Sequence, residues 1–319
     1  MDHLLQHATS PLGATGLEIT RIGFGAWAIG GGDYKFGWGS QEDGDSVAAI
    51  GRALELGINW IDTAAIYGLG RSERVVGEAL AGLAARPYVF TKASRVVDET
   101  GTITGNLTRD SIRRELEASL SRLRLDAIDL YQLHWPIPEE DIEEGWTTLV
   151  ELRAEGLVRH IGVSNFNVEQ LRRIQAIAPV ETLQPPYSLV AREAEDEILP
   201  FCEQSGIGVV VYSPMGSGVL TGAMTRERIA SLPADDWRHS HPRFQEPELS
   251  RNLALAERLA TVGARHGASA GAVAVAWALR HPAVDGAIVG FRRPDQVEGI
   301  LAGATLELTP EDLETIEAG

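Results

Sequence analysis

Short apolar runs alternate along almost the whole chain with segments whose apolar residues recur at helical spacing, as in residues 46–56. Helix starts are also marked, because Asn167 with Gln170 resembles a capping box and Ser72 is placed to cap another helix. Strands that are separated by helices favour a parallel sheet. The predicted strands number eight and are residues 23–27, 58–61, 88–92, 128–134, 158–163, 183–187, 207–212 and 287–290. Eight such β/α units predict closure into a barrel.

The fold prediction is therefore α/β, a (β/α)8 TIM barrel with parallel strands, and a single domain over residues 1–319. A short N-terminal hairpin is expected around residues 17–23, where the first strand begins. The longest irregular segment, residues 216–247, follows the seventh strand. A loop of this length in a compact domain is usually functional or disordered.

Composition excludes several classes of function. The net charge of −17 argues against a nucleic acid or an anionic membrane as partner, since either would require a basic face. Cys202 is the single cysteine, so no internal disulfide is expected, and it shows no metal-ligand spacing with the histidines. The N-terminus does not resemble a signal peptide, and no apolar run approaches the ~18 residues of a membrane span. A cytoplasmic location is the simplest expectation.

Four polar side chains follow the predicted strands closely. Asp62, Lys92 and His134 each end a strand, and Tyr67 lies in the loop after one. Active sites of such barrels lie at the C-terminal ends of the strands, so these side chains are expected to converge. Each one alone has an ordinary structural interpretation, as a packed aromatic, an edge charge, a hydrogen-bonded histidine or a turn cap. Together they predict a proton-transfer site.

The predicted roles follow from the chemistry of each group. A phenol holds its proton with a pKa near ~10, and a neighbouring ammonium favours the phenolate. Tyr67 is therefore the predicted general acid for a carbonyl, and Lys92 is expected to lower its pKa. Asp62 pairs with Lys92 and limits the cost of a buried ammonium. His134 orients the carbonyl oxygen.

The set of Asp62, Tyr67, Lys92 and His134 resembles the tetrad of the aldo-keto reductase superfamily. Further motifs resemble that family in the same order, from about Gly16 to about Gly303: residues 22–27, 161–166, 184–187, 211–216 and 290–294. The resemblance implies an enzyme that reversibly reduces aldehydes and ketones to alcohols with NADPH. Because some relatives with this tetrad act mainly as regulatory subunits, a cofactor-binding regulatory or redox-sensor subunit with slow chemistry is the alternative.

The tetrad moves protons, so hydride must come from a nicotinamide cofactor. No G-x-G-x-x-G follows a strand, and a Rossmann site is not expected. The resemblance instead implies cofactor contacts at Trp27, Asp62, Ser164, Asn165, Gln184, Tyr212, Ser213, Pro214, Met215, Gly216, Gly218, Gly290, Arg292 and Gln296.

Each part of the cofactor has its own expected contacts. Ser164, Asn165 and Gln184 have groups suited to the nicotinamide carboxamide, and Tyr212 is expected to stack on the ring. Residues 213–218 form a glycine-rich loop that can direct backbone N–H groups to the pyrophosphate.

Cofactor choice depends on the segment after the last strand. Arg292 and Arg293 precede a helix start, where an arginine fork suits the 2′-phosphate, so NADP is predicted over NAD. The chain departs from many relatives at Ile300, near the adenine, where they carry asparagine.

The substrate is expected to be a small carbonyl compound or alcohol. Trp27 and Trp135 are the predicted pocket residues, because each adjoins a motif, while Trp38 and Trp237 are further aromatic candidates. A metal-dependent barrel hydrolase is a third interpretation. It is disfavoured, because histidine and carboxylate ligands do not cluster at the predicted strand ends.

Overall fold

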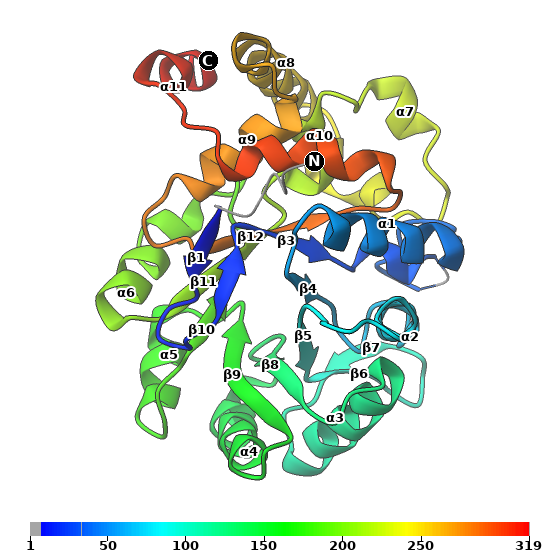
Figure 1. Cartoon of the computed structure of the whole chain (residues 1–319), viewed down its shortest axis with the longest axis vertical. Coiled ribbons are helices and arrows are strands. Elements are labelled where there is room, and N and C mark those ends of the chain that lie inside the picture. Colours follow the sequence, from blue (N-terminus) through cyan, green and yellow to red (C-terminus); the bar gives the residue numbers. More distant parts are fainter. Residues whose placement is uncertain (1–7, 33, 319) are drawn as a thin grey trace.

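The computed structural model describes residues 8–32 and 34–318. Eight parallel strands close into a barrel in the order β10-β11-β12-β3-β4-β5-β8-β9, with helices around the outside (Figure 1). The predicted barrel is therefore confirmed. The barrel strands are β3 (Ile22–Gly25), β4 (Trp60–Asp62), β5 (Tyr88–Ala93), β8 (Ile128–Leu133), β9 (Val158–Ser164), β10 (Thr182–Gln184), β11 (Gly208–Tyr212) and β12 (Gly286–Gly290).

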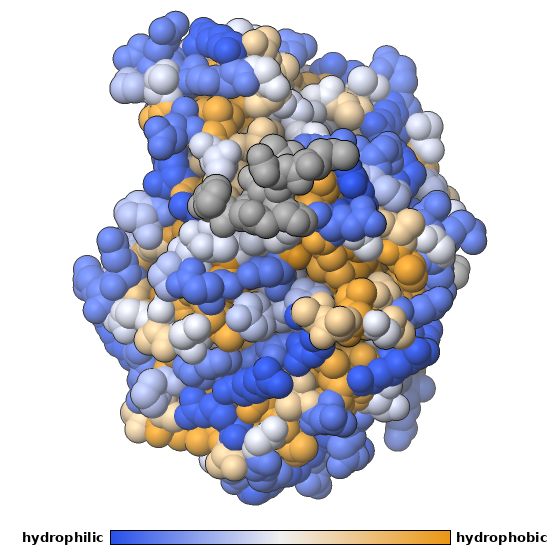
Figure 2. Space-filling view, in the orientation of Figure 1, coloured by the Kyte–Doolittle hydropathy of each residue, from blue (hydrophilic) through white to orange (hydrophobic). Residues whose placement is uncertain are grey.

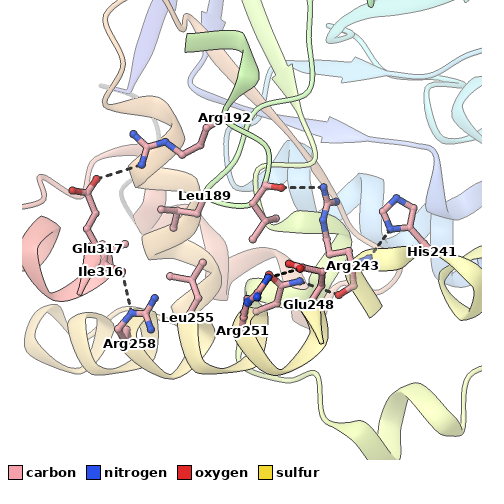
Figure 3. Close-up of a pocket in the computed structure, with 12 residues that line it drawn as sticks. Leu189, Arg192, His241, Arg243, Glu248, Arg251, Leu255, Arg258, Ile316 and Glu317 are labelled. Carbon is pink, nitrogen blue, oxygen red and sulfur yellow. Dashed lines mark hydrogen bonds and ion pairs between the residues drawn. The ribbon is translucent and has the colours of Figure 1, made fainter. Parts of the chain in front are cut away.

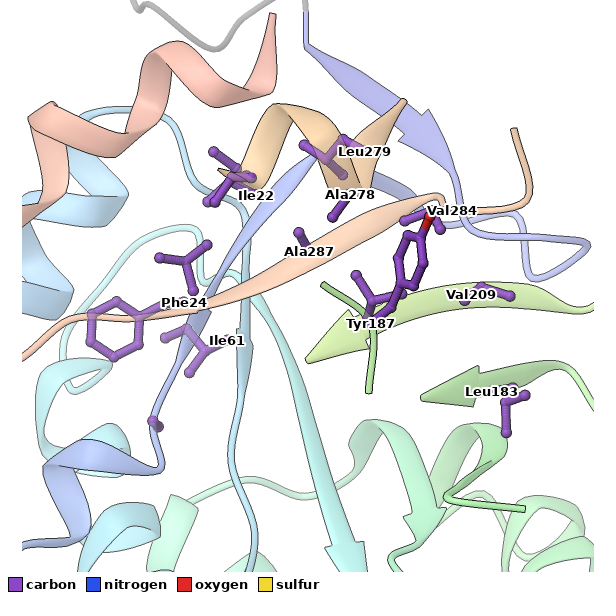
Figure 4. Close-up of a cluster of buried hydrophobic side chains, with 14 of the residues drawn as sticks. Ile22, Phe24, Ile61, Leu183, Tyr187, Val209, Ala278, Leu279, Val284 and Ala287 are labelled. Carbon is purple, nitrogen blue, oxygen red and sulfur yellow. The ribbon is translucent and has the colours of Figure 1, made fainter. Parts of the chain in front are cut away.

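Helices surround the barrel (Figure 1). They are α1 (Asp43–Glu55), α2 (Arg71–Ala79), α3 (Arg109–Leu123), α4 (Ile142–Ala154), α5 (Val168–Gln175), α6 (Ile198–Ser205), α7 (Arg226–Ala230), α8 (Glu248–His266), α9 (Ala270–Leu279), α10 (Asp295–Leu301) and α11 (Pro310–Glu317). Some of them pack on other helical segments, as α11 does on α8 and α7 does on η5 (Trp237–Ser240). Every residue of α9 is buried, as expected for a helix that is apolar all round. In Figure 4 its residues Ala278 and Leu279 lie close to Ile22 of β3 and Ala287 of β12.

The N-terminal hairpin closes the end of the barrel where the strands begin. It pairs β1 (Thr9–Pro11) with β2 (Glu18–Thr20), so it starts earlier than predicted. The Trp60 indole N–H donates to the Thr20 carbonyl at 2.7 Å, and its ring lies 5.1 Å from that of Phe90 inside the barrel. These contacts fill the N-terminal end of the barrel with apolar groups. A catalytic site can therefore lie only at the C-terminal end of the strands.

Two connections differ from the sequence-based expectation. The segment after β11 is not irregular, because it contains η4 (Gly216–Thr221), α7, η5 (Trp237–Ser240) and η6 (Pro242–Phe244). A second hairpin, β6 (Arg95–Val97) with β7 (Ile103–Gly105), follows β5 and was not predicted. Both connections lie beyond the C-terminal ends of strands, where they add walls to the site.

The predicted helix caps had different outcomes. Asn167 and Gln170 form the predicted capping box at α5. The prediction for Ser72 is wrong: α2 begins after Gly70, and the Ser72 hydroxyl donates to the Ala26 carbonyl at 2.7 Å instead. The reason is burial, since a hydroxyl inside the fold must bond to the nearest available acceptor.

Polar side chains dominate the face of the molecule in Figure 2, with apolar ones scattered among them. Among the described residues, none of the helices combines the length and the apolarity that crossing a membrane requires.

Candidate active site

The strand ends bring a buried ion pair to the open end of the barrel. Asp62 is the last residue of β4, and Lys92 lies one residue before the end of β5. The Lys92 ammonium donates to Asp62 Oδ1 at 2.6 Å and to the Thr63 carbonyl at 2.9 Å. Asp62 is 2% exposed and Lys92 1% exposed, so the pair is almost completely shielded from water.

Tyr67 and His134 complete the predicted group. The Lys92 ammonium lies 5.3 Å from the centre of the Tyr67 ring, and the His134 ring lies edge-on to it at 5.7 Å. The Tyr67 loop packs directly on another backbone segment, because a Cβ added to Gly68 would lie 2.1 Å from the Gly30 carbonyl oxygen. Gly68 also has a φ of +57°, which favours glycine. The structure thus brings all four side chains together.

The acid–base properties of Tyr67 differ from the expectation. Burial first, and then the negative charge of Asp62, raise the pKa of the Tyr67 phenol well above its usual value. The predicted lowering by Lys92 is wrong as a net effect, because Asp62 contacts the ammonium and cancels much of its charge at the ring. The phenol therefore keeps its proton at neutral pH, which is the form that a proton donor needs.

His134 is held as a neutral imidazole. Burial, followed by the charges of Lys92 and Arg95, lowers its pKa well below the usual value. Among the described residues its Nδ1 has no hydrogen-bond partner. A neutral imidazole can donate one N–H to a carbonyl oxygen without adding a charge to the site.

An amide network lies beside the ion pair. Gln184 Nε2 donates to Asp62 Oδ2 at 2.9 Å, while Asn165 Nδ2 donates to the His134 carbonyl at 2.9 Å. The Tyr212 hydroxyl donates to Asn165 Oδ1 at 2.8 Å, and the Ser164 hydroxyl donates to the Gln184 carbonyl at 2.8 Å. These predicted cofactor contacts therefore lie together around the tetrad, but their donors already have protein acceptors.

The glycine-rich loop after β11 offers a cradle for an anion. Ser213, Gly216, Ser217 and Gly218 all have positive φ, a backbone pattern that can form an anion-binding concavity. A Cβ added to Gly218 would meet only Met224 and Arg238, each at 3.8 Å, so there is space above the loop. The residues of this segment thus fit the pyrophosphate of a nicotinamide cofactor.

Three further predicted cofactor contacts, two in this loop and one at the end of β12, differ in how closely the protein packs around them. Pro214 is buried, and the Met215 sulfur lies 3.1 Å from the position of a Cβ on Gly271 in α9. Gly290, at the end of β12, is exposed, with no atom closer than 3.8 Å to an added Cβ.

Arg238 is a site residue for which no role was predicted from the sequence. Its guanidinium donates to Asp236 through Nε at 2.9 Å and Nη2 at 2.6 Å, and it stacks on the Trp38 ring at 4.5 Å. The remaining nitrogen, Nη1, lies toward Gly218. The proximity of Asp236 and Arg238 in sequence indicates a local ion pair, but nothing local places that pair beside the glycine loop.

The arginines after β12 are not equivalent. Arg292 donates to Gln41 Oε1 at 2.7 Å, to the Trp38 carbonyl at 3.0 Å and also to the Ser40 carbonyl. It is thereby anchored to the loop that carries Trp38. The side chain of Arg293 is 55% exposed, and within residues 8–32 and 34–318 its one carboxylate partner is Asp295, at 3.1 Å.

Gln296 organises the same turn from the first helical turn of α10. Its side-chain oxygen accepts the backbone N–H groups of Arg292 at 2.7 Å and Arg293 at 3.1 Å. Gln296, a predicted cofactor contact, therefore also holds the backbone of both arginines.

Aromatic side chains form one wall of the site. Trp27 stacks on Tyr67 at 6.2 Å and on Trp237 at 5.3 Å, and its edge-to-face contact with Trp38 is 5.1 Å. Trp135 is 38% exposed and belongs to none of these contacts. Trp38 and Trp237 are therefore the direct neighbours of Trp27, whereas Trp135, the other predicted pocket residue, is not among them.

The sequence matches a known protein family over almost its whole length. The family model described as "Aldo/keto reductase family" matches residues 21–318. The chain belongs to the aldo/keto reductase family. Members of this family are NAD(P)H-dependent oxidoreductases of carbonyl substrates, so this reductase is an enzyme of that class.

Relatives of this reductase extend over nearly its whole length. "Aldo-keto reductase YhdN" of Bacillus subtilis is 39% identical over 95% of the chain and 90% of that protein. "NADH-specific methylglyoxal reductase" of Escherichia coli is 34% identical over 95% of each. The glycerol dehydrogenase AKR11B4 from Gluconobacter oxydans has a solved structure with a TM-score of 0.87 and 36% identity, covering 100% of this chain and 95% of that one.

The relatives and the described side chains can be compared with the two alternative functions, a regulatory subunit and a metal-dependent hydrolase. The names of these relatives describe enzymes, and they do not support the regulatory-subunit interpretation. Within residues 8–32 and 34–318 there is no group of three or more His, Cys, Asp or Glu side chains able to hold a metal ion.

Proposed function

We propose that this reductase converts aldehydes and ketones to alcohols, with Tyr67 as the proton donor and NADPH as the preferred hydride source. The observation that carries the proposal is the convergence of Tyr67, His134 and the Lys92–Asp62 pair at the end of the barrel, beside the glycine-rich loop. The nicotinamide supplies hydride when bound. The protein groups supply the proton and orient the carbonyl.

The proposed proton transfer uses the protonation states described above. Neutral His134 donates a hydrogen bond to the carbonyl oxygen and orients it toward Tyr67. The Tyr67 hydroxyl gives its proton to that oxygen as the alcohol forms. The Lys92 ammonium lies 5.3 Å from the ring centre of the phenolate left behind, and the part of its charge that Asp62 leaves uncompensated favours that phenolate. Water then returns the proton.

A panel of aldehydes and ketones, each tested with NADPH and with NADH, examines the proposed activity directly. Steady-state turnover with carbonyl substrates is the expected result. Tight cofactor binding with almost no turnover on any member of the panel would instead support the regulatory interpretation.

Cofactor choice is the finer part of the proposal, since one relative is named as NADH-specific. We assign the 2′-phosphate to Arg293, because Arg292 already donates to three acceptors of the 38–41 loop. The Arg293–Asp295 pair is exposed on both sides, and such pairs contribute little stability. A phosphate dianion can therefore replace Asp295 as the partner of Arg293.

Substitution of Arg293 by Ala is expected to weaken NADPH by roughly 10–150-fold, the value of a lost charge-assisted hydrogen bond of ~1.5–3 kcal/mol. NADH, which lacks the phosphate, should bind almost as before. Fluorescence titration of both cofactors measures the two affinities.

Arg292→Ala is the matched control for this experiment. It releases the loop that carries Trp38, so it should weaken NADPH and NADH to a similar extent. Equal weakening of both cofactors by Arg293→Ala would show that Arg293 does not recognise the phosphate, and the preference for NADPH would lose its support.

A further inference from the structure

The β6–β7 hairpin places an arginine at the rim of the active site. Arg95 is the first residue of β6 and pairs with Gly105 of β7. Residues that face each other in an antiparallel pair extend their side chains to the same face of the ribbon. A Cβ added to Gly105 would lie 2.7 Å from Ile137 Cγ2, so this face packs on the loop that follows His134. The Arg95 side chain therefore leaves the hairpin on the side of that loop.

The charge of Arg95 acts on the tetrad. The lowered pKa of His134 has burial as its main cause, followed by the charges of Lys92 and Arg95. Coulomb interactions weaken with distance and are screened by water, so this effect requires the guanidinium to lie close to the imidazole. The hydroxyl of Ser94, directly before Arg95, donates to the Trp135 carbonyl at 3.2 Å and holds the hairpin on the same loop. The hairpin thus holds a cation beside the group that is proposed to orient the carbonyl oxygen.

Arg95 has no negative partner in the part of the chain that the structure describes. Burial alone shifts the pKa of its guanidinium, downward, and no carboxylate there opposes the shift. Asp98 accepts hydrogen bonds within its own turn, and Glu99 is exposed. Glu115 accepts the backbone N–H of Ser94 at 3.1 Å. The acidic side chains of this region therefore leave the half-buried guanidinium unpaired.

Arginines that are paired with carboxylates lie elsewhere on the molecule. Figure 3 shows two of them at a cavity of about 640 Å³. Arg192 pairs there with Glu317 at 3.5 Å, and Arg251 pairs with Glu248 at 2.5 Å. A half-buried guanidinium without such a partner has lost part of its hydration without compensation. An anion bound beside Arg95 would supply that compensation.

Exposed apolar side chains lie around this position. Val97 follows Arg95 by two residues in β6, so both extend from the same face of the strand. Trp135 and Ile137 belong to the loop on which this face packs, and all three apolar side chains are exposed. Apolar surface with a few polar groups is typical of sites for small ligands. The ligand expected here therefore combines an anionic group with an apolar body.

We propose that Arg95 binds an anionic group of the substrate, so that this reductase recognises aldehydes and ketones that carry a carboxylate or a phosphate on an apolar body. This inference rests on the proposed carbonyl reduction, because the carbonyl group of such a substrate lies at Tyr67 and His134 while its anion meets Arg95. A guanidinium fork forms paired hydrogen bonds with either anion. The apolar body then covers the exposed side chains of Val97 and Trp135.

Matched aromatic aldehydes test this recognition. 3-Carboxybenzaldehyde and 4-carboxybenzaldehyde carry the anion at two distances from the carbonyl, their methyl esters are neutral, and 4-formylphenyl phosphate is the phosphate probe. The acids are expected to have lower KM values than their esters. Arg95→Met should reduce the acid-to-ester ratio of kcat/KM by roughly tenfold or more, mainly through KM, because a charge-assisted contact is lost. Arg95→Lys, which keeps the charge, should retain part of the ratio.

The ratio also separates substrate binding from an indirect effect on His134. If Arg95 served only to lower the pKa of His134, its loss would change the acids and the esters by the same factor. Arg109→Met is the matched control, since Arg109 follows the hairpin at the start of α3 and is already paired with Glu151. This variant should keep the ratio of the unchanged protein. Circular dichroism confirms that each variant is folded.

Equilibrium binding distinguishes a failure of this inference from a failure of the proposed function. 4-Methylbenzoate has no aldehyde or ketone group, so calorimetry with the full-length protein and nicotinamide cofactor measures its affinity without turnover. It should bind more tightly than neutral 4-methylbenzamide and weaken roughly tenfold or more in Arg95→Met. Binding of this kind without turnover of any aldehyde would remove the proposed reduction and leave the anion site. The inference is overturned if Arg95→Met changes acids and esters alike, or if it binds 4-methylbenzoate as tightly as the unchanged protein.

Discussion

Replacement of Tyr67 by Phe is expected to lower kcat for carbonyl reduction by ~10²-fold or more, with cofactor affinity nearly unchanged. The substitution removes the phenolic proton and keeps the ring that stacks on Trp27 at 6.2 Å and meets His134 at 5.7 Å. The aromatic wall should therefore survive while the acid is lost. Steady-state kinetics and cofactor titration on the same preparation measure both quantities.

Tyr34→Phe is the matched control. The Tyr34 hydroxyl accepts the Trp27 indole N–H at 3.1 Å, so this variant removes a phenol next to the site but outside the proposed proton path. It should retain most of kcat. If Tyr67→Phe kept a third of the unchanged turnover, with chemistry rate-limiting, Tyr67 could not be the proton donor.

The second expected result concerns stability. Asp62→Ala should lower the free energy of unfolding by ~3–5 kcal/mol, since breaking a buried ion pair leaves an uncompensated charge. The Lys92 ammonium would keep only the Thr63 carbonyl, at 2.9 Å, as an acceptor in a site shielded from water. Denaturant unfolding near neutral pH measures the loss.

The stability of Asp62→Ala is expected to increase with pH. Burial already lowers the pKa of Lys92 from its usual 10.5, and loss of Asp62 removes the main opposing effect. The unfolded chain then binds more protons than the folded one, so the stability of Asp62→Ala should rise with pH up to about 10.

Two further variants test whether the loss of stability comes from the buried charge of Lys92. Adding Lys92→Met to Asp62→Ala removes the buried charge and should recover much of the lost stability. Glu55→Ala breaks an exposed pair with Arg52 and should cost no more than ~1 kcal/mol. A loss for Asp62→Ala as small as that for Glu55→Ala would contradict the assigned role of the buried pair.

Much of the architecture was predictable because its signals are local. The apolar runs that became β5, β8 and β11 lie within one or two residues of their predicted positions. Their parallel arrangement places the residues at their C-terminal ends at one end of the barrel, which is why Asp62 and Lys92 could be expected to meet. The capping box at Asn167 was likewise readable, since both of its partners lie within one helical turn.

Several features were missed because they have weak or distant sequence signals. The two helices α8 and α9 lie between β11 and β12, and the uniformly apolar α9 lacks the one-sided pattern that marks an amphipathic helix. The position of Arg238 beside Gly218 depends on how η5 folds back over the barrel end. Neither the helix α9 nor the position of Arg238 beside Gly218 can be predicted from the spacing of residues in the chain.

Periodicity and strand order are properties of neighbouring residues, so the sequence alone specified the barrel and the four side chains gathered at its open end. The protonation and availability of those groups depend on burial and on competing hydrogen bonds, which arise from segments far apart in the chain. Contact with Asp62 cancels much of the Lys92 charge at Tyr67, whose pKa burial raises. Contact with the 38–41 loop likewise occupies Arg292 and leaves Arg293 exposed. Such competition is settled only when the whole chain is folded.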